Sequence, residues 1–485
     1  MRITFLFTIS CILGLFVSSA LAVEGIEFDF HGNMLQVVGS TNNSLGMAGE
    51  IKSGKTDFFS YNGALNTKGT DTYGFSIAGK APAYYDNYDS DKTDYMRYLN
   101  TVGTTYGLSK ARLRFEARTK DKLAKFVYGL EVGTVNWGDQ SKKFGLSGDG
   151  VTQESRYAYA EIKAPLDGIS HVIRAGLQPT KINHWVWTET AAGLTYHGKS
   201  PSCKWMVGWY RGDENTKSNS TDNNYFVLKA SGPLSPELEL GLFMVYEHAG
   251  AEETSVYEPK SLTPTELEID NDKYDRKIYY LGTTLALDSQ PFTGKFEIIY
   301  QGGDISFIDD DIDDLERGAM LIHMDMGFQV NQQLKVGVNS LYVSGDDNPN
   351  DQDANNFDAI DVDVKVGMML FKNHLVSSCD RFVSDAPYIL DKGLMHHALT
   401  ADYKLNKKHS FFTAIRRLAL TKDIADESDL GMELDFKYAY KFNKYVKLRL
   451  ESACLLPGGA SDLMTADGQD ADTNVTVAAG IQFKF

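Results

Sequence analysis

The sequence predicts an all-β protein: a transmembrane antiparallel β-barrel of about 18 strands. Three observations lead to this fold class. The chain begins with an apolar leader, no later segment reaches 18 uncharged apolar residues, and long strands with two-residue alternation recur up to the aromatic Phe485. A chain that crosses a bilayer without helices must pair its backbone polar groups between strands, and only a closed barrel does so for every strand.

The apolar leader is typical of a secretory signal peptide. Arg2 precedes an apolar run over residues 3–17, and Ala20 and Ala22 form an A-x-A cleavage pattern. The run is too short for a membrane-spanning helix, which needs about 20 apolar residues. We therefore expect a signal peptide over residues 1–22, cleaved after Ala22, and a single barrel domain over residues 23–485.

The composition excludes several classes of function. A net charge of −17 argues against a nucleic-acid partner. Cys203, Cys379 and Cys454 have no C-x-x-C, zinc or haem spacing, so we predict no cofactor. No G-x-S-x-G, H-E-x-x-H or Walker A pattern occurs. We predict that the protein is not an enzyme.

The last strand, residues 474–485, has the clearest pattern. Apolar side chains stand at the odd positions from Val475 to Phe485, whereas most of the even positions are polar. This twelve-residue period of two fits a tilted strand that crosses a bilayer. We expect Phe483 and Phe485 to face lipid, and Gln482 and Lys484 to face the lumen.

Similar pairs of strands recur along the chain. Adding a first strand near residues 26–38 and the final strand to eight hairpins gives 18 strands, and 16 or 20 strands also fit the pattern. Residues 39–108 could not be divided into strands, so we expect a long loop there that could fold inward. The short turns fall at residues 120–122, 166–168, 198–202, 232–236, 288–293, 331–333, 406–408 and near Asn443.

The long connections differ in composition from the short turns. Residues 346–363 contain seven aspartates, whereas lysines such as Lys120, Lys122 and Lys444 mark the short turns. Short periplasmic turns and long outer loops are the usual asymmetry of bacterial barrels. We therefore expect both chain ends in the periplasm and the acidic loops outside.

One acidic loop is a weak candidate for binding a divalent cation. Its candidate ligands are Asp346, Asp347, Asp351 and Asp353. A calcium site needs six to eight oxygens at set spacing, and the glycine and terminal glutamate of an EF-hand are absent. We favour a solvated acidic loop.

Several short motifs resemble strands of Gram-negative outer-membrane porins. Residues 156–159 (RYAY) and 174–178 (RAGLQ) resemble paired porin strands, and the final aromatic residue resembles the signal for insertion of such barrels. Residues 342–347 (YVSGDD) and 430–435 (LGMELD) look like later strands of large alginate-export and delta-proteobacterial porins. The resemblance covers most of residues 105–485. It implies a channel of roughly 16–18 strands, a homotrimer or a monomer, and no particular solute.

The strand alternation assigns side chains to the wall of an aqueous lumen. Rings of mixed charge could select solutes by charge, or could only keep the wall rigid and solvated. The triplet Arg112, Arg114 and Arg118 is the best candidate for selectivity. The proposed pore-lining residues are Arg112, Arg114, Glu116, Arg118 and Glu131 in one group, and Glu433, Asp435, Lys437, Lys447, Arg449 and Glu451 in a second group.

Two tryptophans follow a predicted strand. Trp185 and Trp187, next to His184, could form an aromatic track for sugar rings. Tryptophan at a strand end is more often an interfacial anchor, and we favour the anchor.

The favoured function is an outer-membrane porin, a passive channel for small hydrophilic solutes or ions whose partners are these solutes and membrane lipid. One alternative is a channel specific for sugars or oligosaccharides. The other is a structural barrel that holds a partner, such as an electron-transfer protein, and a plugged lumen would favour it.

Overall fold

The computed structural model describes the barrel wall and parts of its connections. The predicted signal peptide and residues 43–103 of the predicted long loop lie outside the described residues. The described residues are 25–42, 104–137, 153–166, 169–212, 223–257, 269–307, 314–346, 352–362, 366–367, 392–424, 426–462 and 473–485.

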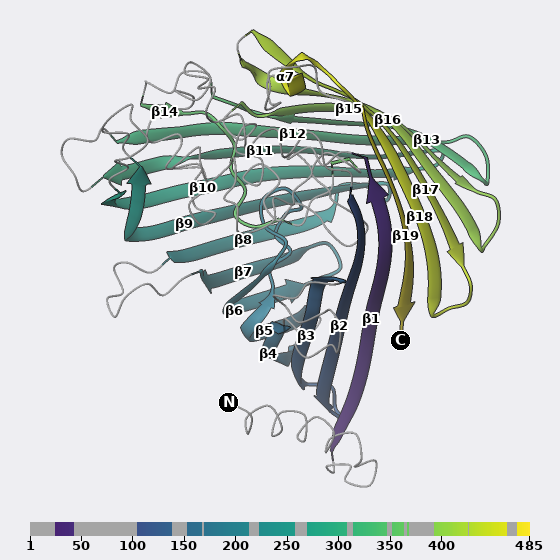
Figure 1. Ribbon diagram of the computed structural model, residues 1–485. Helices are drawn as coiled ribbons and strands as arrows, with labels where there is room; N and C mark the ends of the chain where they lie inside the picture. Colours follow the sequence, from purple (N-terminus) through teal and green to yellow (C-terminus); the bar gives the residue numbers. More distant parts are fainter. Residues whose placement is uncertain are drawn as a thin grey trace.

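The described chain consists almost entirely of strands (Figure 1). The first nine are β1 (Ile26–Thr41), β2 (Thr104–Thr119), β3 (Ala124–Asn136), β4 (Gln153–Leu166), β5 (Ile169–Pro179), β6 (Thr190–Lys199), β7 (Lys204–Arg211), β8 (Asn223–Pro233) and β9 (Leu238–Tyr257). The next five are β10 (Ile269–Ser289), β11 (Phe292–Phe307), β12 (Leu315–Gln329), β13 (Leu334–Val343) and β14 (Asp353–Ala354). The last are β15 (Leu394–Lys404), β16 (His409–Ile424), β17 (Glu427–Lys441), β18 (Val446–Pro457) and β19 (Asn474–Lys484), with a short helix α7 (Gly459–Asp462) between β18 and β19. Within the described residues, no helix is long and apolar enough to cross a membrane.

The strands form one closed antiparallel barrel. The sheet has 19 strands, of which the two-residue β14 pairs in parallel with one end of β12. The other 18 follow each other around the wall in sequence order, and β1 pairs with both β2 and β19. The predicted fold class and the predicted strand number are confirmed.

Eight connections of two to four residues join strands along one rim, the short-turn rim. All eight predicted hairpin turns are confirmed. Asn331, Asn406 and Asn443 each accept two backbone N–H bonds from the following residues of their own turn. Asparagine favours turns because its side chain can bond the backbone in this way. The opposite, long-loop rim carries connections of at least seven residues, except between β16 and β17.

The alternation of the sequence corresponds to the two faces of the wall. In β19, Val477, Ile481 and Phe483 are exposed on the outer face, whereas Asn474 is buried on the inner face. Gln482 donates a hydrogen bond of 2.9 Å to the side chain of Asn33. Because lipid contacts one face and the lumen the other, the side chains alternate in polarity along each strand.

The seam between the first and last strands closes at Phe485. The backbone of Phe485 exchanges two hydrogen bonds with Gly32, of 2.9 and 3.0 Å. Its ring lies over Gly32, where an added Cβ atom would be 2.2 Å from the ring. The ring also lies 5.4 Å from Phe30 and 5.3 Å from Phe483, measured between centroids. Glycine at position 32 therefore makes room for the last side chain.

The first strand is longer than expected. It runs to Thr41, and β2 starts at Thr104, so both ends of the predicted 39–108 loop belong to strands. The alternation of polarity in β1 breaks near residue 35, because Leu35 and Val37 are buried in one apolar cluster with Leu108 and Ala478.

Candidate functional site: the narrowed lumen

The segment of residues 180–189, between β5 and β6, is anchored to the inner wall. The carboxylate of Glu297 on β11 accepts hydrogen bonds from the Asn183 amide (3.0 Å) and the Trp185 indole (3.2 Å). The same carboxylate pairs with Lys295 at 2.8 Å and with His323 at 3.0 Å. The Glu297 side chain is 1% exposed. A buried carboxylate of this kind is stable only with several donors, and here it holds the segment against the wall.

A second segment, residues 352–362, lies beside the first. The amide of Thr188 donates to the carbonyl of Asp361 (2.9 Å), and the amide of Ile360 donates to the carbonyl of Val186 (2.9 Å). Trp187 and Asp361 also form an isolated parallel bridge. The two segments, residues 180–189 and 352–362, therefore form one unit in the lumen, called the inward unit below.

Three wall residues bind the backbone of the second segment. Tyr280 donates to the carbonyl of Asp358 (3.1 Å), and Arg317 donates to the carbonyl of Asn356 (2.6 Å). The amide of Asp358 donates to the Gln301 side chain (2.9 Å). All three side chains are buried and lie on β10, β11 and β12. The unit therefore narrows the lumen from one side of the barrel.

The prediction that Trp185 and Trp187 anchor the protein at the membrane interface is wrong. Both side chains are buried, at 5% and 3% exposure. Trp187 packs against Tyr210 and Tyr225, with centroids 5.0 and 4.7 Å away, and Trp185 packs against His323. Their ring faces are covered, so they offer no open track for sugar rings. Trp185 can be buried inside the barrel and not placed at the membrane interface because the buried Glu297 accepts a hydrogen bond from its indole N–H.

The first predicted lining group lies on the inner face of β2 and β3. Glu131 is 2% exposed and pairs with Arg112, with Lys110 (2.7 Å) and with Arg156 (3.5 Å). Arg156 also pairs with Glu189 at 2.5 Å and with Glu154 at 3.7 Å, so three carboxylates face the three cations of this cluster.

The other members of this group also form ion pairs. Arg114 pairs with Glu116 at 3.1 Å, and Arg118 pairs with Asp29 and, at 3.7 Å, with Glu116. The predicted arginine triplet is therefore brought together with carboxylates. The side chains of Arg112 and Arg114 remain 39% and 46% exposed inside a closed barrel.

The second predicted lining group lies on β17 and β18. Glu433, Asp435 and Glu451 are buried. Asp435 pairs with Arg416 at 2.5 Å, and Arg449 with Glu451 at 2.7 Å. The Lys437 ammonium lies 5.0 Å from the Phe412 ring centroid. Lys447 shares the inner face of β18 with Arg449. Two strands, β1 and β19, separate this group from the first.

The predicted acidic loop is only partly described. Asp347 and Asp351 lie outside the described residues. Asp346 is buried and accepts a hydrogen bond of 2.9 Å from the amide of Asn355, whereas Asp353 is exposed in β14. Among the described residues, no group of three or more metal-ligating side chains is placed to hold a metal ion.

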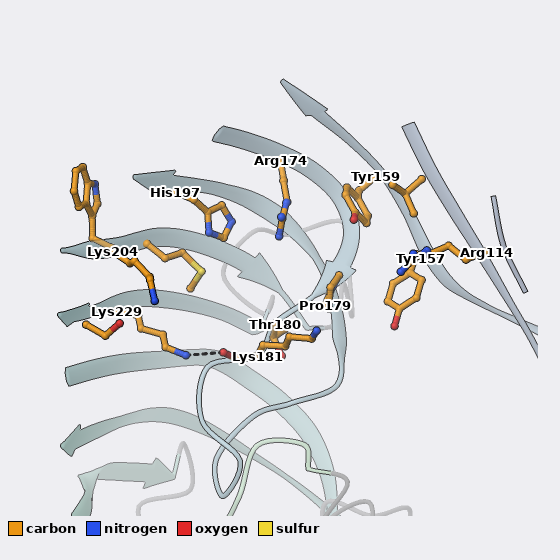
Figure 2. A pocket seen from close by; sticks show the side chains of 14 residues that line it. Arg114, Tyr157, Tyr159, Arg174, Pro179, Thr180, Lys181, His197, Lys204 and Lys229 are labelled. Carbon is orange, nitrogen blue, oxygen red and sulfur yellow. Dashed lines mark hydrogen bonds between the residues drawn. The ribbon is translucent and has the colours of Figure 1, made fainter. Parts of the chain in front are cut away.

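A cationic pocket, not predicted from the sequence, lies between the inward unit and the short-turn rim (Figure 2). Its volume is about 480 Å³. Beside His197, five lysine and arginine residues and no acidic residue line it: Arg114, Arg174, Lys181, Lys204 and Lys229. They come from β2, β5, β7, β8 and the segment of residues 180–189, so no local sequence pattern predicts the pocket.

Comparisons with known proteins give matches in structure only. No protein-family model and no curated protein sequence matches the chain. One similar solved structure is Pseudomonas aeruginosa OccK8 (OprE), which is 10% identical; the match covers 95% of this chain and 98% of that chain with a TM-score of 0.49. Pseudomonas aeruginosa OpdQ is 11% identical, and the match covers 94% of this chain and 97% of that chain with a TM-score of 0.48. An anion-selective porin from Comamonas acidovorans is 11% identical, and the match covers 95% of this chain and 100% of that chain with a TM-score of 0.42.

Proposed function

We propose that the protein is an outer-membrane porin, a water-filled channel for passive diffusion of small hydrophilic solutes and ions. The observation that supports this most is the exposure of charged side chains inside a closed barrel. Arg112 and Arg114 point inward from β2 and keep 39% and 46% of their side-chain surface accessible. A barrel of about 18 strands is wide enough for an aqueous lumen.

The arrangement of the inward unit supports the same proposal. Residues 180–189 and 352–362 pack against the side of the lumen formed by β7 to β12. Water-accessible arginines lie on the opposite side, near the seam. Among the described residues, this asymmetry favours a narrowed channel over the alternative of a plugged barrel that only holds a partner. The resemblance to alginate-export and delta-proteobacterial porins, and the choice between homotrimer and monomer, stay predictions.

Liposome swelling tests the proposal. We expect purified protein to admit neutral sugars at rates that fall steadily with their molecular mass, because a narrowed lumen without an open aromatic track selects by size. Liposomes without protein are the control. Uptake of one sugar faster than all smaller ones would favour the sugar-specific channel instead, and absence of swelling with every solute would refute the proposal.

A further inference from the structure

We infer that the cationic pocket binds small organic anions that bear carboxylate or phosphate groups. This inference rests on the proposed channel function and names a class of solute for it. The chain as a whole is acidic, with 65 acidic and 48 basic residues. A pocket lined by five lysine and arginine residues and no acidic residue therefore departs from the composition of the protein.

The ion pairs around the pocket leave it with excess positive charge. Arg114 and Arg174 pair with Glu116 and Glu161, at 3.1 and 2.7 Å. Glu116 also contacts Arg118, but Arg118 has Asp29 as a second partner, so this pair of arginines is balanced. Glu161 is shared between Arg174 and Lys125, so Arg174 is only partly neutralised.

The lysines contribute the larger part of the excess. Lys229 donates to the carbonyls of Lys181 (2.9 Å) and Ile182 (2.7 Å), which are neutral partners (Figure 2). Lys204 meets the exposed Glu239 only at 3.9 Å. Within the described residues, no carboxylate lies in ion-pair distance of Lys181 or Lys229. Charged donors of this kind bind anions most strongly.

The other walls of the pocket suit an organic ligand. Tyr157 and Tyr159 face it from the inner side of β4, and Thr180 lies where the inward unit begins. A volume of about 480 Å³ lies in the range of small-molecule sites. The pocket adjoins the inward unit on the side of the short-turn rim, so a solute that has passed the narrowed part of the lumen meets it.

Single-channel recording in planar bilayers tests this inference, with citrate as the carboxylate probe, glucose 6-phosphate as the phosphate probe and glucose as the neutral match. We expect both anions, and not glucose, to interrupt the current in a concentration-dependent way. The double variant Lys181→Gln/Lys204→Gln should weaken this block about ninefold, because each unit charge about 7 Å away in water changes binding about threefold and two charges are removed. Lys229 is left in place because it also holds the backbone of the inward unit.

The matched control is Lys407→Gln/Lys408→Gln, which removes the same charge from an exposed turn of the short-turn rim. The two anions should block the current through this control variant as strongly as they block the current through the wild type. Block by one anion alone supports the inference and identifies the acid group that binds. Equal block of both double variants, or equal block by glucose and glucose 6-phosphate, would overturn it. Conductance steps that neither anion blocks would refute anion binding by the pocket but would still support the proposed channel function. Absence of conductance steps would refute the channel function itself.

Discussion

Deletion of Phe485 is expected to reduce assembly of the barrel far more than conduction by the barrels that do assemble. The deletion removes two backbone hydrogen bonds to Gly32 and the ring contacts with Phe30 and Phe483. Hydrogen bonds of about 1 kcal/mol and aromatic pairs of about 0.5–1.5 kcal/mol make the loss about 4 kcal/mol in all. The measurement is the fraction of protein that migrates as folded barrel in unheated gel samples.

Gly32→Ala tests the same contact without shortening the chain. A Cβ atom at position 32 would lie 2.2 Å from the Phe485 ring, so the ring must move, at a cost of about 1–3 kcal/mol. Gly241→Ala is the control, since its added Cβ atom has no neighbour nearer than 3.6 Å. Heat-resistant barrels at wild-type yield from the Phe485 deletion would contradict the role assigned to the seam.

Glu297→Ala is expected to loosen the inward unit and to raise both single-channel conductance and current noise. The substitution leaves the Asn183 amide and the Trp185 indole without their acceptor and leaves Lys295 without its ion pair. Removing one partner of a buried charge pair costs about 3–5 kcal/mol. Glu297→Gln should have a smaller effect, because the amide oxygen can still accept a hydrogen bond.

The control for this prediction is Asp325→Ala. Asp325 is an exposed carboxylate on β12, two residues from His323. Its removal changes the charge of the lumen and leaves the anchor of the inward unit intact. If the Glu297 and Asp325 variants conduct alike, or if Glu297→Ala conducts as the wild type does, residues 180–189 do not set the width of the channel.

The barrel wall could be predicted from the sequence because lipid and lumen impose opposite polarity on neighbouring residues. This rule placed the faces of β17, β18 and β19 correctly, and turn chemistry located all eight hairpins. It also placed Glu131, Glu433 and Glu451 on the inner face. It could not show that Glu131 is buried in ion pairs, because its partners Lys110, Arg112 and Arg156 lie on the neighbouring strands β2 and β4.

The inward unit could not be predicted by the same rule, since it has no periodic pattern. One signal was available in the sequence. Residues 182–187 contain Ile182, Trp185, Val186 and Trp187 within a ten-residue connection, and an outer loop exposed to water would not bury such side chains. Their anchor, Glu297, lies more than 100 positions away on a strand that resembles ordinary wall. The cationic pocket could not be predicted either, because its lysines lie on β7, β8 and the segment of residues 180–189 and meet only once these elements pack together.

Single-channel recording of the wild-type protein in planar bilayers tests the central claim most directly. A closed barrel with water-accessible charges inside should give discrete, reproducible steps of conductance, and the Glu297→Ala variant should give larger and noisier ones. Folded protein that inserts into the bilayer without producing any conductance step would contradict the account.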